Sequence, residues 1–324
     1  MNLSMISFRR VRGGRLLRAL WAAGVGGLGT MYLVSLSLHS TLLLPLYCES
    51  ECVQMVWEGC VAPESQVMLR HIRRQVLDPP QKQVAEPITP QEVDDPPWFN
   101  VRTWMVAEGA IRQVFAHKKR GVFVEVGAGS GVFMSHTAWL EYRRKWWGLL
   151  VEPRLEAYTH LRRRRKAVSA RVCVSDYSHN KQDVLWSPGK TEDLSDHYRN
   201  MALSRSTLMA YVTQEDQQGS LATPVQCYTL EALVWAAFGH QRPIDLLVLD
   251  TAGGEYKILD TLQRLKISCL LVKYNTEVDR TFIMASARLL NLYPQHSATL
   301  QAERFLFFVN PSAGYNITSW ERPT

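Results

Sequence analysis

Short apolar runs alternate with longer amphipathic stretches after Trp98, and this alternation limits the possible folds more than any other feature of the chain. The apolar runs are rich in β-branched residues and predict strands at 121–126, 148–152, 170–175, 244–250, 268–274 and 305–309. The amphipathic stretches predict helices near 101–117, 132–145, 154–165, 229–238, 254–265 and 279–291. We therefore expect an α/β domain with a mostly parallel sheet covered by helices on both faces.

Two segments interrupt this pattern. Residues 176–223 are polar and poorly periodic, which predicts loops with one short helix. Residues 298–310 (ATLQAERFLFFVN) resemble a closing hairpin, which would add antiparallel strands at one edge of the sheet.

The stretch from Ala19 to Cys48 contains no Asp, Glu, Lys or Arg. It is longer than the roughly 20 residues that cross a bilayer as a helix. A cleaved signal peptide usually has a shorter apolar region, and a buried soluble helix is the other alternative. Residues 1–18 carry five arginines and no acidic residue. This flank favours a signal anchor over 19–47, with the span within 19–44, the tail cytosolic and the body lumenal or extracellular.

Residues 48–97 predict a stem between this anchor and a folded domain over 98–324. Cys48, Cys52 and Cys60 would face a compartment that permits disulfides, and an odd number leaves one for an intermolecular bridge or for acylation. Seven of the fifteen prolines fall between residues 61 and 97, which favours an extended chain.

The formal charge of +7 belongs mostly to the amino-terminal tail. Removing its five arginines leaves 32 basic against 30 acidic side chains, or +2. The net charge therefore says little about the partners of the body. A nucleic-acid partner is not expected, because the predicted topology places the body away from nucleic acid. The basic run at 162–166 is interpreted as the solvated end of a helix, with phosphates, glycan sulfates or acidic lipids as the alternative partners.

A predicted strand runs into three glycines and then a predicted helix at residues 122–142. Gly127, Gly129 and Gly131 would let backbone N–H groups approach a ligand, although their spacing is not the dinucleotide pattern. Glu152 ends the next predicted strand, where an acidic side chain can accept hydrogen bonds from ribose hydroxyls. Together these features fit S-adenosylmethionine better than NAD, and an ordinary strand-to-helix turn is the alternative.

Five blocks resemble, in order, the FkbM-type methyltransferase domain, and more narrowly its animal membrane-anchored, Star-like branch. They are VFVEVGAGSG (122–131), WWGLLVEPRLEAY (146–158), RVCVS (171–175), PVQCYTLEAL (224–233) and IDLLVLDTAGGEYKIL (244–259). The resemblance implies a Rossmann-like, doubly wound, mostly parallel sheet, binding of S-adenosylmethionine and O-methyl transfer in enzymatic members. For Star-like members it implies transport of a growth-factor precursor through the secretory pathway.

The resemblance also implies roles for individual residues. Glu125, Gly127 and Gly129 match the cofactor loop, and Glu152 matches the ribose-binding acid. Two further pairs match the adenine-side loop and the acidic positions after the fourth strand: Ser175 with Asp176, and Asp250 with Glu255. The last pair are the catalytic candidates, with Asp250 holding the methionine amino group or orienting the acceptor hydroxyl. The alternative for these carboxylates is a solvated strand or helix end.

Three positions depart from the family's common pattern. Ser130 and Ala252 stand where many members carry carboxylates, and Lys273 stands where the fifth strand commonly carries Glu. A positive Lys273 beside a cationic cofactor would be unfavourable unless Asp250 or Glu255 pairs with it. The departures place catalysis in question.

Other candidate sites follow from single residues. Cys173 and Cys227 lie in apolar runs and are either buried thiols or a disulfide. Asn316 begins an acceptor sequon, which predicts glycosylation if the body is lumenal. The histidines have no zinc spacing with cysteine, so no metal site is expected.

Three functions fit these features. The first is a membrane-anchored methyltransferase that acts on a hydroxyl of a glycan or protein. The second is a non-catalytic Star-like factor for membrane-tethered cargo between endoplasmic reticulum and Golgi, with the endosome and plasma membrane as further locations. The third, a lumenal glycosyltransferase, is disfavoured because no Asp-x-Asp motif occurs in residues 98–324.

Overall fold

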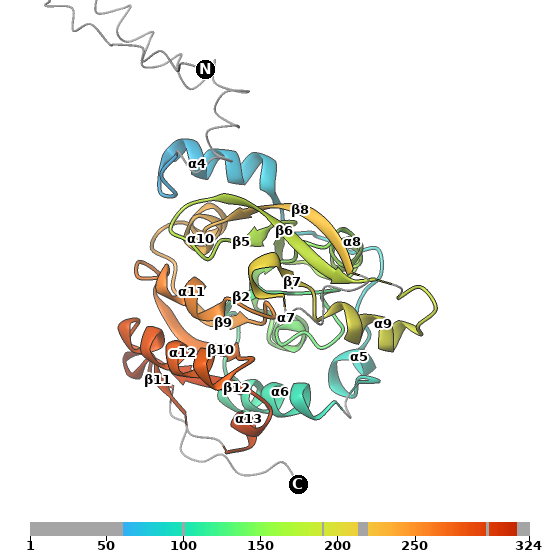
Figure 1. Cartoon of the computed structure of the whole chain (residues 1–324). Helices are drawn as coiled ribbons and strands as arrows, with labels where there is room; N and C mark the ends of the chain where they lie inside the picture. The colour runs from blue at the N-terminus through green and yellow to red at the C-terminus, as the bar shows by residue number, and fades with distance from the viewer. Residues whose placement is uncertain (1–60, 99–100, 190, 213–219, 296–297, 316–324) are drawn as a thin grey trace, which may run out of the picture. The chain divides into compact units, whose positions relative to one another are not determined.

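The computed structural model describes residues 61–98, 101–189, 191–212, 220–295 and 298–315 (Figure 1). Within these residues the main sheet has eight strands in the order β1-β4-β3-β2-β9-β10-β12-β11. The strands are β1 (Leu77–Asp78), β2 (Val122–Val126), β3 (Trp147–Val151), β4 (Val168–Ala170), β9 (Ile244–Leu249), β10 (Ile267–Lys273), β11 (Tyr293–Pro294) and β12 (Phe305–Val309). The five strands from β4 to β10 in this order are parallel, whereas β1, β12 and β11 pair antiparallel. The predicted α/β fold is confirmed, with a mixed sheet.

Helices cover both faces of this sheet. One apolar core contains residues of four helices: α4 (Gln66–His71), α10 (Leu230–Phe238), α11 (Glu255–Asp260) and α12 (Glu277–Leu289). The second apolar core contains residues of five helices: α5 (Pro90–Asp94), α6 (Arg102–Val114), α7 (Ala138–Arg144), α8 (Leu155–Arg164) and α13 (Ala298–Ala302). Neighbouring residues of β2 divide between them: Val124 enters the first core and Phe123 the second. Because both faces are covered, the strands are apolar throughout.

Most of a second sheet lies where the sequence predicted loops and a short helix. Its order is β5-β8-β6-β7, with β5 (Cys173–Val174), β6 (Lys181–Pro188), β7 (Thr207–Leu208) and β8 (Ser220–Tyr228), and α9 (Asp196–Leu203) follows β6. The short helix predicted within 176–223 is present as α9, but the expectation of loops for the rest of the segment was wrong, because it contains β6, β7 and the start of β8. Figure 1 shows β6 and β8 as a long two-stranded ribbon, paired antiparallel from Lys181 to Pro188. Only one β6 side chain, Leu185, is buried, so the strand has little apolar periodicity to reveal it.

Part of the predicted stem belongs to the folded domain. Met68, Leu69 and Ile72 are fully buried in the first core, and β1 adds an antiparallel edge to β4. The expectation that residues 61–97 form an extended stem was wrong, because the prolines fall outside α4 and β1 and because Pro90 begins α5 in a capping box made by Thr89. The predicted anchor over 19–47 and the first part of the stem, residues 48–60, lie outside the described residues.

The basic run at 162–166, at the end of α8, binds the segment 61–97 to the rest of the domain. Arg163 pairs with Glu86 at 2.6 Å, and Arg164 forms two 2.8 Å hydrogen bonds with the Glu92 carboxylate. Arg165 is fully buried and donates at 3.1 Å to Glu141. The run therefore has a structural role, which neither interpretation of the sequence included.

The predicted elements at the carboxyl end are partly corrected. Strand β12 has the predicted bounds and pairs antiparallel with β10, but residues 298–302 form α13 instead of a hairpin strand. The antiparallel edge partner of β12 is β11. The predicted strand over 170–175 is divided between β4 and β5, which belong to different sheets. Among the described residues, no helix has the length and apolar character needed to span a bilayer.

Candidate functional site

A cleft opens at the carboxyl ends of the parallel strands, where the chain leaves β2 for β3 on one side and where β9 adjoins β2 on the other. Such a switch in strand order is where open α/β sheets bind ligands. Six predicted site residues line this cleft: Glu125, Gly127, Gly129, Glu152, Asp176 and Asp250. It encloses a cavity of about 110 Å³, several times the space that one water needs, so side chains do not plug it.

The carboxylate of Glu152 contacts the glycine turn directly. The Gly129 amide donates to Oε2 at 2.8 Å, and Oε1 accepts from the amide and Nε of Arg154 at 3.0 and 2.9 Å. Only 4% of the Glu152 side chain is exposed. The predicted meeting of the acidic residue and the glycine turn is thus present, and Arg154 is an additional partner that the sequence analysis missed.

Gly127 and Gly129 differ in the space around them: Gly127 packs against backbone, and Gly129 borders open space. Gly127 has φ +85°, and a Cβ there would lie 2.0 Å from the Asp250 carbonyl oxygen, so only glycine lets the turn press against the end of β9. Gly129 has φ +54°, and a Cβ there would have Arg154 as its nearest neighbour at 3.8 Å. The Gly129 position thus leaves open space in the cleft. Gly131 lies outside the cleft lining, where a Cβ would meet Arg165 at 2.8 Å.

Glu125 organises the loop between the glycine turn and α7. Its carboxylate accepts from the Ser135 hydroxyl and the His136 amide at 2.9 Å each, and from the Thr137 hydroxyl at 2.5 Å. Burial raises the pKa of Glu125, against the nearby charge of Arg165 and these hydrogen bonds. These bonds use the residues that the sequence analysis assigned to a helix from 132, and α7 consequently begins only at Ala138.

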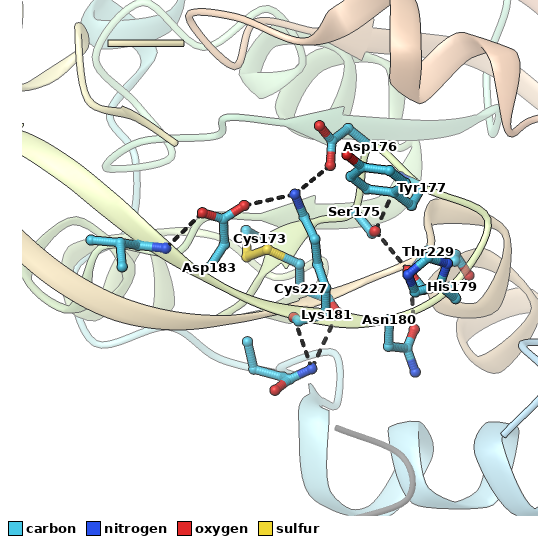
Figure 2. The surroundings of a disulfide bond; sticks show 12 residues. Cys173, Ser175, Asp176, Tyr177, His179, Asn180, Lys181, Asp183, Cys227 and Thr229 are labelled. Atoms are coloured by element: carbon cyan, nitrogen blue, oxygen red, sulfur yellow. Dashed lines mark hydrogen bonds and ion pairs between the residues drawn. A yellow bond between two sulfur atoms is a disulfide. The ribbon is translucent and has the colours of Figure 1, made fainter. Parts of the chain in front are cut away.

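Asp176 lies on the β5 side of the cleft. It pairs with Lys181 at 2.5 Å and accepts a 2.5 Å hydrogen bond from the Tyr211 hydroxyl (Figure 2 draws the Lys181 pair). Although burial opposes it, these two partners hold the pKa of Asp176 below its usual value. Ser175 is fully buried outside the cleft lining and donates to the His179 carbonyl at 2.7 Å. Of the predicted adenine-side pair, only Asp176 faces the cleft.

A disulfide joins Cys173 to Cys227 and closes a separation of 54 residues (Figure 2). The two cysteines are parallel neighbours on β5 and β8, and Cys173 also lines the cleft. Of the two alternatives left open by the sequence, the disulfide is the one formed. It holds the second sheet together immediately before Ser175 and Asp176.

Asp250 and Lys273 form an ion pair on the other side of the cleft. Lys273 Nζ lies 3.2 Å from Asp250 Oδ1, at the ends of β10 and β9. The charge of Asp250, against the effect of burial, raises the pKa of Lys273, which therefore stays protonated. The pairing that a cationic ligand would require of Lys273 is present.

Glu255 does not reach the cleft. Its Oε1 accepts from the amides of Thr251 and Gly253 at 3.0 and 3.1 Å, and burial raises its pKa to about 7. The carboxylate therefore holds the loop after β9 in shape. Asn316, the predicted glycosylation site, lies outside the described residues.

His136 also lines the cleft, close enough to Asp250 and Lys273 for both charges to influence its ionisation. The sequence did not indicate this role, because the only pattern considered for the histidines was zinc spacing with cysteine. Its position ten residues after the end of β2 gave no local signal. Among the described residues, no group of His, Cys, Asp and Glu is arranged to hold a metal ion.

The mixed α/β sheet, the glycine turn and the acid that follows β3 are consistent with a methyltransferase domain. The family model described as the methyltransferase FkbM domain matches residues 114–307, which is more than half of the chain. The chain therefore belongs to the FkbM methyltransferase family. A search of curated proteins returned no match.

Proposed function

We propose that this protein is a single-pass type II membrane protein whose lumenal domain binds S-adenosylmethionine and transfers its methyl group to a hydroxyl. The observation that carries the proposal is the 2.8 Å hydrogen bond between Gly129 and Glu152, which joins a glycine turn and an acidic residue at one cleft. Membership of the FkbM family supports S-adenosylmethionine as the cofactor.

The residues of the cleft fit this cofactor. The open space at Gly129 leaves room for a ligand beside exposed backbone, and a carboxylate such as Glu152 has about four lone-pair sites, of which the protein uses three. Glu152 would bind the ribose hydroxyls if Arg154 yields part of its contact. Asp176 would lie on the adenine side, and Asp250 on the methionine side.

Bound S-adenosylmethionine supplies a methyl group on a positively charged sulfur. The protein's part is to align the acceptor oxygen and to receive its proton. Asp250 is the candidate for orienting the acceptor, and its ion pair with Lys273 neutralises the ammonium that would otherwise repel the cofactor. Glu255 would support this arrangement through the loop after β9.

The membrane topology rests on the sequence. The uncharged stretch from 19 to 48 and the arginines before it support an anchor with a lumenal body. The Cys173–Cys227 disulfide is typical of proteins in an oxidising compartment. A glycosidase-sensitive mass shift that disappears in Asn316→Gln would support this topology, whereas cleavage of the intact body by a cytosolic protease would contradict it.

A non-catalytic Star-like role in moving membrane-tethered cargo is the second candidate. It is favoured by the contacts that Arg154 makes with Glu152 and Lys273 makes with Asp250, since both carboxylates have a protein partner already. In that role the domain would bind cargo between endoplasmic reticulum and Golgi without using the cleft for chemistry.

Calorimetric titration of the full chain with S-adenosylmethionine separates the two candidates. We expect binding that Glu152→Gln weakens at least tenfold. The matched control is Glu156→Gln, which changes an exposed glutamate in the first turn of α8 and should leave affinity unchanged. No binding at millimolar cofactor would favour the transport role.

A further inference from the structure

The imidazole of His136 is held rigidly at the cleft. Only 3% of the residue is exposed, and its backbone amide is fixed by the 2.9 Å bond to Glu125. The ring packs edge-on against Phe305 of β12, with centroids 5.3 Å apart and planes at 78°. Its neighbours Ser135 and Thr137 donate to the same glutamate. The ring position is therefore set by groups other than its own nitrogens.

One of the two nitrogens of this ring makes no hydrogen bond within the described part of the chain. Nδ1 is buried and has no hydrogen-bond partner among the described residues. Most buried polar atoms in native proteins are paired, because leaving one unpaired costs its lost interaction with water. A rigid, buried imidazole at a cleft with an unpaired nitrogen is therefore best explained by a ligand.

The charges around His136 restrict what that ligand can be. Asp250 and Lys273 face it from β9 and β10, and the Glu125 carboxylate lies at its backbone. Burial lowers the pKa of His136 to about 4, so the ring is neutral at physiological pH. A neutral imidazole can donate at one nitrogen and accept at the other.

We propose that His136 binds the acceptor of the proposed methyl transfer through Nδ1, and that this acceptor group is a neutral hydroxyl. The inference rests on the proposed function and names a substrate-binding residue within it. His136 lies with Asp250 and Lys273 on the side of the cleft away from Glu152, so it would contact the acceptor and not the ribose of the cofactor. Asp250 and Lys273 neutralise each other and the imidazole is neutral, so no net charge there would compensate the cost of burying a carboxylate or an ammonium acceptor.

A ligand-binding role makes an unusual prediction for stability without any ligand. His136→Phe keeps the edge-on contact with Phe305 and removes the unpaired nitrogen, so its melting temperature should equal or exceed that of the wild type. The matched control is His71→Phe. His71 is half-buried, and its Nε2 forms a 2.9 Å hydrogen bond with the Tyr228 hydroxyl, so this variant should melt at a lower temperature. A melting temperature of His136→Phe below that of the wild type would overturn the proposal.

The ligand class is tested with three small probes of similar size: glycerol, glycerate and 2-amino-1,3-propanediol. They are added at equal concentration to the full chain, labelled with ¹⁵N-histidine and saturated with S-adenosylhomocysteine. We expect glycerol to shift the His136 Nδ1 resonance and the two ions to leave it in place. An unshifted resonance with glycerol, or an equal shift with either ion, contradicts the proposal.

The proposed function and the role of His136 can be contradicted by different results. If S-adenosylhomocysteine does not bind, the proposed function fails, while the melting comparison, made without cofactor, still decides whether Nδ1 lacks a partner. If the cofactor binds and His136→Phe is destabilised, the proposed function stands and the role of His136 fails.

Discussion

The two sides of the cleft treat their polar groups differently. On the β3 side, Glu152 already accepts three hydrogen bonds of 2.8 to 3.0 Å from Gly129 and Arg154. On the β9 and β10 side, Asp250 and Lys273 pair with each other, and the nearby His136 has a buried nitrogen without a partner among the described residues. A ligand that binds Glu152 through both ribose hydroxyls must therefore displace a protein contact, whereas a ligand on the β9 and β10 side can bond to a nitrogen of His136 that has no partner among the described residues.

Gly127 is where the two sides meet, and its replacement should have the largest effect. In Gly127→Ala the new Cβ would lie 2.0 Å from the Asp250 carbonyl at φ +85°. Overpacking and the left-handed backbone together should cost about 5 kcal/mol of unfolding free energy or prevent folding. Urea denaturation measures this cost. Gly129→Ala is the matched variant, and since its Cβ meets nothing closer than 3.8 Å, it should cost only about 1 to 2 kcal/mol. Equal losses would show that the two sides are not pressed together at Gly127.

The disulfide should matter to the cofactor side and not to the acceptor side. Replacing Cys173 and Cys227 by serine opens a crosslink across 54 residues, which in the chain-entropy model costs about 4 kcal/mol of unfolding free energy. Because Cys173 lies next to the cleft beside Asp176, affinity for S-adenosylmethionine should fall as well. The control is Cys269→Ser, a buried free cysteine on β10. A double variant with unchanged melting temperature and affinity would contradict this role.

The third effect depends on pH. The pKa of His136 is about 4 in the folded chain, below its ordinary value of 6.5, so the folded state resists protonation. Its contribution to stability is present above pH 6.5 and is lost as the pH falls to 4. Buried Glu108 and Glu255, with pKa values of about 7, act in the opposite direction, since their contribution is present below pH 4.5 and is lost as the pH rises to 7.

Both His136→Phe and the wild type contain Glu108 and Glu255, so the contributions of these glutamates to the pH dependence of stability cancel when the two proteins are compared. The variant should gain about 3 kcal/mol of unfolding free energy relative to the wild type as the pH falls from 6.5 to 4. Denaturation curves at pH 7 and pH 4.5 measure most of this gain. Parallel pH dependence in the two proteins would contradict the buried, neutral state of His136.

The smallest expected effect is on cofactor affinity. Lys273→Met leaves the Asp250 carboxylate without its counter-charge near the site of a sulfonium, so S-adenosylmethionine should bind about tenfold more tightly, or by about 1.4 kcal/mol. S-adenosylhomocysteine has no sulfonium charge, and its affinity should change little. Lys257→Met, which lies near Asp176 on the other side, is the control. An equal gain for both ligands would indicate that the sulfonium is not near Lys273.

The sequence predicted what depends on local pattern. Apolar runs located four of the five parallel strands of the main sheet, all except β4, within one residue, and the glycine turn with Glu152 predicted the contact that the structure contains. Elements that depend on contacts with residues far away in the sequence were not predicted. Strand β6 exists through its pairing with β8, and α4 is held by burial of Met68 and Leu69. The composition of those segments indicated loop and stem, since tertiary pairing is not visible in a single sequence.

The candidate site shows the same division. Glu152 could be predicted because it ends the strand that follows the glycine turn, whereas Asp176 and Asp250 were predicted from the resemblance to the FkbM domain. Arg154 and His136 could not, because one depends on a side-chain contact back to Glu152 and the other on a loop held by Glu125.

A crystal structure of the protein with S-adenosylhomocysteine tests the central claim most directly. The account predicts ribose hydroxyls within hydrogen-bonding distance of Glu152, the Arg154 guanidinium displaced, and the ligand's sulfur on the side of Asp250 and His136. A ligand bound elsewhere, or no bound ligand at millimolar concentration, would contradict the assignment of this cleft to a methyl donor.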